Sequence, residues 1–480
     1  MNRVRLLSQV VCGVLLPGFL VLLFPLAAYA QAEAPTLEPT RDETSIPLIH
    51  TVAEGENLTH IAEQYGVTVE SLLLINQLIE SDILSVGQQI VIPGGDGERV
   101  ATIYSVQLGD TLPYIATRFN TTVEEVVATN NLVNPTAPLR IGQTLAVVSR
   151  TGSTEPQVVA GQPHVVASGE SLLMIAARYG LSPLTLADAN GLSFPAYVFA
   201  GQRIRIPGVG EYRDLPGGWL DIQVRPLPVV QGSTVSIYVE NRLDERPTGR
   251  FAGQTLHFVE RGSGYVALAG LDAFTAPGYY PLVLDSFGEY PGSLFQQEIP
   301  IQSGRYETQS IAVGEDLDML LDPEVRAAED ALFASIYGHF SEPQQWEGLF
   351  QLPLTRTVVT APYGVGRSYN NGPVDIYHTG IDFAEAAGVS VLAPATGTVV
   401  FTGQLDVRGI TLIIDHGLGV MSGYYHLADT FVEQGDNVTS GQKIASVGTT
   451  GLSTGPHLHW DVRIMNMPVD GFQWTREIFP

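Results

Sequence analysis

Hydrophobic and polar positions repeat three times along the first half of the chain. The segments 50–78, 104–132 and 164–192 align, and the tails VGQQIVIP, IGQTLAVV and AGQRIRIP follow them. In each unit a short alternating run leads to a glycine turn and then to an apolar stretch of helical period, such as LTHIAEQY. The pattern predicts a small strand–helix–helix–strand unit. Its second helix is expected to end at an asparagine, which suits a helix C-terminus: Asn76, Asn130 and Asn190.

The three repeats resemble the LysM module along their whole length. This resemblance implies binding to glycans that contain N-acetylglucosamine, such as peptidoglycan or chitin. The second repeat departs most, because Pro113 falls in its first helix and the segment PTAPLR lengthens a loop. A generic small αβ repeat that serves only as a spacer is the alternative.

The pattern changes to short alternating strands over residues 217–303. Val235, Ile237 and Val239 are expected to face a core, while the residues between them face outward. Turns rich in glycine and proline separate the strands, which predicts a small β-sandwich-like domain without a catalytic constellation. A helix that starts at Asp322–Pro323 is expected to brace this domain against the last one.

The last part of the chain, from residue 350, is glycine-rich and strand-like, and it concentrates histidines. The segment YHTGIDF places His378 and Asp382 four positions apart, on the same side of an extended segment. The segment PHLHWDV places His457 and His459 on one face, with Leu458 and Trp460 on the other. Two histidines and an aspartate form a three-ligand set with an open position, which is typical of catalytic zinc.

Dense motifs over roughly 355–470 resemble the M23 (lysostaphin/LytM-type) metallopeptidase domain: HTGIDFAEAAGVSVLAPATGTVVFTG, LIIDHGLGVMSGYYHL, VEQGDNVTSGQKIASVGTTG and STGPHLHWDV. The resemblance implies that one Zn²⁺ per chain is held by His378, Asp382 and His459. It implies that His426 and His457 are the unligated active-site histidines; which of them is the base stays open. Asp461 stands where relatives often have glutamate, a change expected to affect the orientation of neighbouring groups rather than ligation.

Charge and cysteine content narrow the function further. The chain has 24 Lys+Arg against 50 Asp+Glu, a formal net charge of −26, which argues against nucleic acid and anionic lipid as partners. The single cysteine, Cys12, lies in an apolar N-terminal run that follows Arg3 and Arg5 and ends in an A-x-A pattern at Ala30. This run is expected to be a signal peptide cleaved after Ala30, with an uncleaved membrane anchor as the alternative. A mature chain without cysteine must build a metal site from histidine and carboxylate.

The expected protein is therefore an exported cell-wall hydrolase of several domains. It would be a zinc-dependent endopeptidase that cuts peptides of peptidoglycan while the repeats hold the glycan, either secreted or in the cell envelope. A catalytically inactive wall-bound adaptor that activates an amidase is one alternative, and an enzyme that acts on other extracellular proteins is another. Glycine bridges and D-Ala–diaminopimelate cross-links both remain open as the bond cut. The expected boundaries are 1–30 signal peptide, 31–48 linker, 49–94, 103–148 and 163–208 LysM modules, 217–303 β-sandwich-like domain, 304–349 helical connector and 350–480 all-β M23 peptidase domain.

Overall fold

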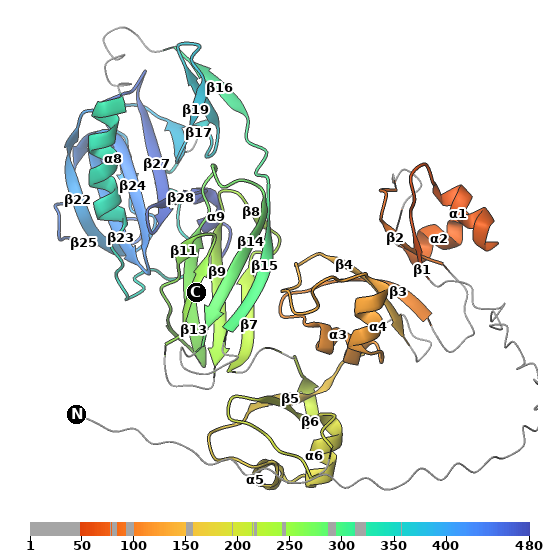
Figure 1. Ribbon diagram of the computed structural model, residues 1–480. Helices are drawn as coiled ribbons and strands as arrows, with labels where there is room; N and C mark the ends of the chain where they lie inside the picture. Colours follow the sequence, from red (N-terminus) through yellow and green to blue (C-terminus); the bar gives the residue numbers. More distant parts are fainter. Residues whose placement is uncertain are drawn as a thin grey trace, which may run out of the picture. The chain divides into compact units, whose positions relative to one another are not determined.

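The computed structural model describes most of the chain after residue 48 (Figure 1). The described residues are 49–76, 78, 84–92, 100–149, 157–193, 195–213, 215, 218–241, 246–286, 294–312, 323–356 and 358–480. The expected signal peptide and the linker that follows it lie outside these residues. Within them, no helix is both long enough and apolar enough to cross a membrane.

Each of the three repeats contains two short helices between two antiparallel strands, and each has its own small apolar core. The elements are β1 Ile49–Thr51, α1 Leu58–Tyr65, α2 Val69–Ile75 and β2 Gln89–Val91; then β3 Val100–Ser105, α3 Leu112–Arg118, α4 Val123–Thr129 and β4 Thr144–Ser149; then β5 Ala160–Val165, α5 Leu172–Arg178, α6 Pro183–Ala189 and β6 Arg203–Glu211. Pro113 lies in the first turn of α3, where no intrahelical N–H donor is required, so the proline does not interrupt this helix.

The asparagine at the end of each second helix ties that helix to the closing strand. Asn130 donates from Nδ2 to the carbonyls of Val126 and Ala146, both at 2.8 Å, and its Oδ1 accepts from the Ala146 amide at 2.8 Å. Asn76 and Asn190 make the same three bonds in their own repeats. The side chain therefore does more than end a helix, because it satisfies backbone groups of the strand as well.

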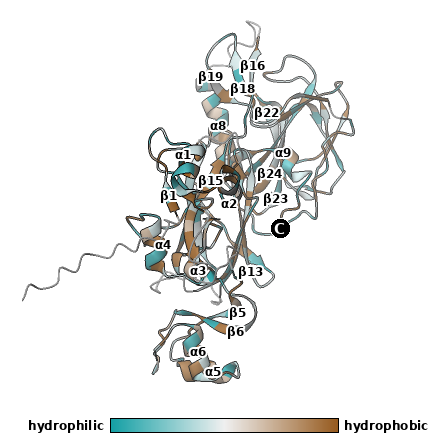
Figure 2. Ribbon diagram, turned by 90° about the vertical axis from the view of Figure 1, so that its right-hand side faces the viewer, coloured by the Kyte–Doolittle hydropathy of each residue, from teal (hydrophilic) through white to brown (hydrophobic). Residues whose placement is uncertain are grey.

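Two mostly antiparallel β-sheets follow the repeats and enclose one apolar core. Their strands are β7 Trp219–Arg225, β8 Val229–Val230, β9 Thr234–Asn241, β10 Thr248–Phe251, β11 Gln254–Thr255, β12 Val259–Arg261, β13 Gly264–Gly270, β14 Gly278–Asp285 and β15 Leu294–Gln302. Val235, Ile237 and Val239 on β9 are each 0% exposed, so the expected alternation on this strand is confirmed. The ribbon of this region carries both hydrophobic and hydrophilic residues (Figure 2).

Residues 304–349, expected as a helical connector, contribute a strand as well as a helix to the C-terminal part. Strand β16 (Thr308–Ile311) pairs in parallel with β18 (Gly366–Tyr369), which pairs with β19 (Val374–Tyr377). Helix α8 (Pro323–Tyr337) lies across the sheet that contains β22, β23 and β24 (Figure 1). Phe333 and Tyr337 of α8 are buried in one cluster with residues of these strands, so the helix packs on the C-terminal sheet.

The C-terminal region is built on one large sheet, for which ten strands fall within the described residues. The strands are β17 Val358–Ala361, β20 Ile381–Ala384, β21 Ser390–Leu392, β22 Gly397–Leu405, β23 Gly409–Gly417, β24 Val420–Thr430, β25 Asn437–Val438, β26 Lys443–Val447, β27 His457–Ile464 and β28 Met467–Val469, and the short helix α9 Gly471–Trp474 follows. Leu458 and Trp460 of β27 are 0% exposed in the core, as the alternation predicted. Their burial turns His457 and His459 to the opposite face of the sheet.

Candidate metal centre and active site

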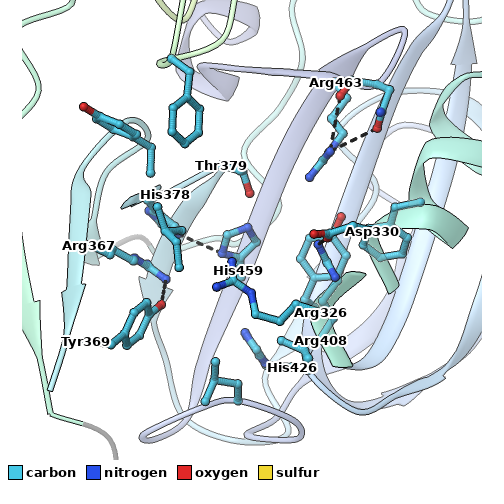
Figure 3. Close-up of a pocket in the computed structure, with 18 residues that line it drawn as sticks. Arg326, Asp330, Arg367, Tyr369, His378, Thr379, Arg408, His426, His459 and Arg463 are labelled. Atoms are coloured by element: carbon cyan, nitrogen blue, oxygen red, sulfur yellow. Dashed lines mark hydrogen bonds and ion pairs between the residues drawn. The ribbon is translucent and has the colours of Figure 1, made fainter. Parts of the chain in front are cut away.

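Three side chains converge on the face of the C-terminal sheet that the core does not occupy. The Oδ1 atom of Asp382 lies 2.9 Å from Nε2 of His378 and 2.7 Å from Nδ1 of His459. The two imidazole nitrogens are 3.0 Å apart. All three residues are buried, and their three facing atoms are arranged to bind a single cation. The structure thus brings together the set expected from the sequence (Figure 3 shows His378 and His459).

Sheet pairing places two of the three residues directly. Asp382 on β20 is the register partner of His459 on antiparallel β27. His378, however, lies in the link between β19 and β20, so the expectation of one extended segment through His378 and Asp382 is wrong. The chain turns at Gly380, where a Cβ atom would lie 2.5 Å from the Trp460 carbonyl oxygen and 2.6 Å from Nε2 of His459. Only glycine allows this close approach, and the turn brings His378 back over the sheet.

The hydrogen bonds of His378 fit a metal ligand. Its Nδ1 lies 2.9 Å from the carbonyl oxygen of Pro362, and because a carbonyl only accepts, Nδ1 carries the proton. In the neutral ring Nε2 then has only a lone pair, which faces a carboxylate oxygen. Burial lowers the pKa of His378 to about 4 despite the nearby Asp382 carboxylate, so at neutral pH a proton does not fill this position. Two nitrogen lone pairs and one carboxylate oxygen are a donor set that fits zinc.

Arg367 on β18 fixes the orientation of the aspartate. Its guanidinium donates to Oδ2 of Asp382 at 2.5 Å, which leaves Oδ1 for the two histidines. Burial alone would raise the pKa of Asp382, but the interactions with His378 and His459 hold this pKa well below its usual value. The carboxylate is therefore ionised and directed at the shared position through one oxygen.

Two further histidines line the same site, and both present Nε2 to it. The Nδ1 atom of His426 donates to the Thr450 carbonyl at 2.8 Å, and Nδ1 of His457 donates to the Gly455 carbonyl at 2.8 Å. The two ring centres are 4.8 Å apart, and Nε2 of His457 lies 3.9 Å from Oδ1 of Asp382. Burial, with the neighbouring histidines, lowers the pKa of His426 to about 3. This neutral ring can accept a proton at Nε2.

The backbone at His426 is strained. Its φ is +58°, in the left-handed region that few residues other than glycine adopt. The residue lies in β24 where the pairing register shifts, and its amide donates to the Arg408 carbonyl at 2.9 Å. Strain of this kind is found at functional sites, where it aims a side chain.

A buried polar network supports the floor of the site. Tyr425, whose ring centre is 5.1 Å from that of His459, donates its hydroxyl to Oδ1 of Asp461 at 3.0 Å. Arg463 donates to Oδ2 of Asp461 at 2.9 Å, and the hydroxyl of Tyr337 on α8 lies 3.3 Å from Oδ1. Asp461 thus has its oxygens occupied by this network and is not one of the three converging groups.

Motif spacing did not identify several residues of the site. A cavity of about 410 Å³ beside the three ligands is lined by four arginines: Arg326, Arg367, Arg408 and Arg463. Arg326 lies on α8, seven and eleven positions before Phe333 and Tyr337, so it occupies the apolar face of that helix. A cation on an apolar face was the one signal in the sequence that could have pointed to this arginine.

Two protein families match parts of this chain. Residues 376–471 match the family described as "Peptidase family M23", and residues 50–93, 104–148 and 164–207 match the LysM domain. The chain therefore carries an M23 peptidase domain and three LysM domains. The M23 match includes the four histidines and both aspartates described above, whereas α8 and Arg367 precede it.

Two curated relatives are similar to parts of the chain. "DD-carboxypeptidase/endopeptidase Mpg" of Neisseria meningitidis is 40% identical over 130 residues, which cover 26% of this chain and 29% of that protein. "N-acetylmuramoyl-L-alanine amidase sle1" of Staphylococcus epidermidis is 29% identical over 168 residues, covering 33% of this chain and 51% of that protein. The chain thus spans about 29% to 51% of the length of these relatives. Among solved structures, the catalytic domain of lysostaphin from Staphylococcus simulans is 25% identical with a TM-score of 0.21, and the match covers 30% of this chain and 98% of that one.

Proposed function

We propose that this chain, which carries an M23 peptidase domain after three LysM domains, is a zinc-dependent endopeptidase that cleaves the peptide part of peptidoglycan. The observation that carries the proposal is the convergence of Nε2 of His378, Oδ1 of Asp382 and Nδ1 of His459 within 3.0 Å of one another. These three atoms would hold one Zn²⁺. The names of relatives, a DD-carboxypeptidase/endopeptidase among them, support peptide bonds of the wall as substrates.

The chain's own residues would perform the proton transfers. Zinc, when bound, would act as a Lewis acid that polarises the peptide carbonyl and lowers the pKa of the attacking water. One of His426 and His457 would accept the proton of the attacking water at Nε2, and the other would stabilise the oxyanion or protonate the leaving amine. Both rings are held by carbonyl bonds at Nδ1, so their free nitrogens face the reacting groups without reorganisation.

The LysM domains would hold the enzyme on the glycan strands of the wall. Three weak sites on one chain raise the local concentration of the peptidase at its substrate, as tethered binding modules do. We propose that residues 1–30 direct export and that the protein works in the cell envelope or outside the cell. The domain boundaries proposed for the described part are those expected from the sequence: 49–94, 103–148, 163–208, 217–303, 304–349 and 350–480.

Zymography of the purified full chain on peptidoglycan tests this proposal. We expect a cleared zone with zinc, no clearing after chelation, and none for His459→Ala under either condition. Mass spectrometry of the digested wall should show loss of peptide cross-links. Clearing by His459→Ala would contradict the metal site, and an unchanged muropeptide pattern would exclude peptidoglycan as substrate.

The same experiment separates the enzyme from an inactive adaptor that activates an amidase. An adaptor would release no product alone but would increase the activity of an added amidase, and His459→Ala would retain that effect. Zinc binding should be measured in parallel, because loss of clearing in His459→Ala counts for the proposal only if the variant also loses its metal.

A further inference from the structure

The cavity beside the metal centre is lined by several arginines, although the protein is strongly acidic. Four arginines and a single acidic residue, Asp330, are its charged lining residues apart from the histidines, although the whole chain has a formal net charge of −26. A local concentration of cations in such a chain favours an anionic group on whatever enters the cavity.

Three of the four arginines are already paired with carboxylates of the protein. Arg367 binds Asp382, and Arg463 binds Asp461. Arg408 binds Glu329 at 3.0 Å and Asp330 at 2.7 Å. These guanidinium groups have internal partners, and their charges are largely compensated.

Arg326 is different, because it has no ion pair or hydrogen bond to any described residue. Asp330, one helical turn further along α8, is taken by Arg408 and does not pair with it. Arg326 is half-buried, and its guanidinium extends into the cavity towards His459 (Figure 3). A guanidinium that is partly desolvated and has no partner in the part of the chain that the structure describes is available to bind an incoming anion.

The helix that carries Arg326 is held firmly on the sheet. Phe333 and Tyr337 are 1% and 0% exposed, and Glu329 accepts from the amide of Val407 at 2.7 Å. The distance between Arg326 and the metal ligands is therefore set by packing rather than by a surface loop. Helix α8 lies entirely before residue 376, where the M23 match begins, so this arginine is supplied by a segment outside the family domain.

We propose that Arg326 forms a subsite that binds a carboxylate of the substrate peptide next to the scissile amide. The proposal rests on the proposed endopeptidase function and narrows its substrate. A glycine bridge has no carboxylate beside its amide bonds. In a D-Ala–diaminopimelate cross-link, the carbon that bears the amide nitrogen also bears a carboxylate. The subsite therefore favours the second type of cross-link with that carboxylate free.

Two cross-linked muropeptides that differ only in this carboxylate test the proposal, one with the free acid and one with the amide. For the zinc-loaded full chain we expect kcat/KM to be about 10- to 100-fold higher for the acid, the range of a charge-assisted hydrogen bond. In Arg326→Gln the preference should fall to within about threefold, mainly through the acid substrate. Arg326→Lys should keep part of the preference for the acid, because the positive charge remains while the paired N–H donors of the planar guanidinium are lost.

Arg250→Gln is the matched control, since Arg250 is an exposed arginine on β10, outside the cavity lining. It should keep the full preference for the acid. An unchanged preference in Arg326→Gln would overturn the subsite. A similar rise in kcat/KM for both substrates would also overturn it, because Arg326 would then obstruct the cleft.

Binding to the metal-free chain separates this proposal from the endopeptidase proposal. Calorimetry with the same two peptides should give a Kd about 10-fold or more lower for the acid, and Arg326→Gln should abolish that difference. If the zinc-loaded chain cleaves neither peptide but retains this difference, the proposed reaction fails and the subsite stands. Equal Kd values for the acid and the amide in the unmodified chain would reject the subsite.

Discussion

At the scale of single residues, the metal centre depends on a contact between Arg367 on one strand and Asp382 on another, because the arginine leaves one carboxylate oxygen for the two histidine ligands. His378, Asp382 and His459 belong to short motifs whose residue types reveal their chemistry. Arg367 has its partner Asp382 fifteen positions away on another strand, and no local spacing marks the pair. Sequence patterns report neighbours along one element, whereas this contact depends on how β18 and β20 are placed.

The hydrogen bond from Arg367 to Asp382 leads to a prediction about metal affinity. Replacing Arg367 with Gln should weaken zinc binding by about 10- to 100-fold, because the carboxylate loses the partner that directs Oδ1 to the metal. Competition with a chelator of known affinity measures the effect on the full chain. Arg408→Gln is the control, since Arg408 lines the same cavity but binds Glu329 and Asp330. Equal zinc affinities in the two variants would contradict the positioning role of Arg367.

The left-handed backbone of His426 predicts an inverted order of stability. Glycine is usually less stabilising than alanine in a strand, but at φ +58° alanine has a steric cost that glycine lacks. His426→Gly should therefore be more stable than His426→Ala by about 1 kcal/mol. Chemical denaturation of the two variants measures this difference in the free energy of unfolding. Loss of the imidazole does not contribute to the difference, because both variants lack it.

Hydrolysis by these variants completes the test. Both should be inactive on peptidoglycan, since neither has the Nε2 atom that faces the reacting groups. A His426→Ala variant at least as stable as His426→Gly would show that the backbone relaxes in the absence of the imidazole. In that case the strain at this position would have no structural cost.

At the scale of elements, periodicity predicted the helices and strands of the repeats, the alternation on β9 and helix α8. It did not predict that β16 pairs in parallel with β18, because a parallel partner more than fifty residues away leaves no trace in local patterning. Pro113 was expected to make the second repeat atypical, yet its position in the first turn of α3 costs no hydrogen bond. The consequence of a proline depends on its place in the helix, which the sequence fixes only to within a turn.

The asparagine that joins the second helix of each repeat to its closing strand predicts that this strand opens more easily when the side chain is removed. Asn130→Ala removes the side chain that binds the carbonyl and the amide of Ala146, whereas the Val126 carbonyl still accepts from the backbone amide of residue 130, so β4 should open more easily by about 2 kcal/mol. Asn130→Asp should be worse, because a carboxylate would face both carbonyls. Hydrogen exchange measured by mass spectrometry on the peptides of β4 follows this opening. Asn134→Ala, a change at an exposed residue that bonds Thr136, should leave the exchange of β4 unchanged.

At the scale of the whole molecule, the acidic charge and the arginine-lined cavity have opposite consequences for substrate binding. The net charge of −26 repels the carboxylates of the proposed substrate, whereas the cavity attracts one of them. If the LysM domains hold glycan through hydrogen bonds rather than charge, attachment to the wall does not require low salt. The repulsion between chain and wall then remains as the only long-range electrostatic effect on attachment.

Raising NaCl from about 0.1 M to about 1 M shortens the screening length from about 10 Å to about 3 Å. Binding of the full chain to insoluble peptidoglycan should stay constant or increase, because screening removes repulsion, and sedimentation of the wall measures the bound fraction. Over the same range the ratio of kcat/KM for the soluble acid muropeptide to kcat/KM for its amide should fall, as Arg326 loses part of its attraction for the carboxylate. Release of the chain from the wall by salt would show instead that cations of the repeats bind the wall, and that the acidic composition conceals a local basic surface.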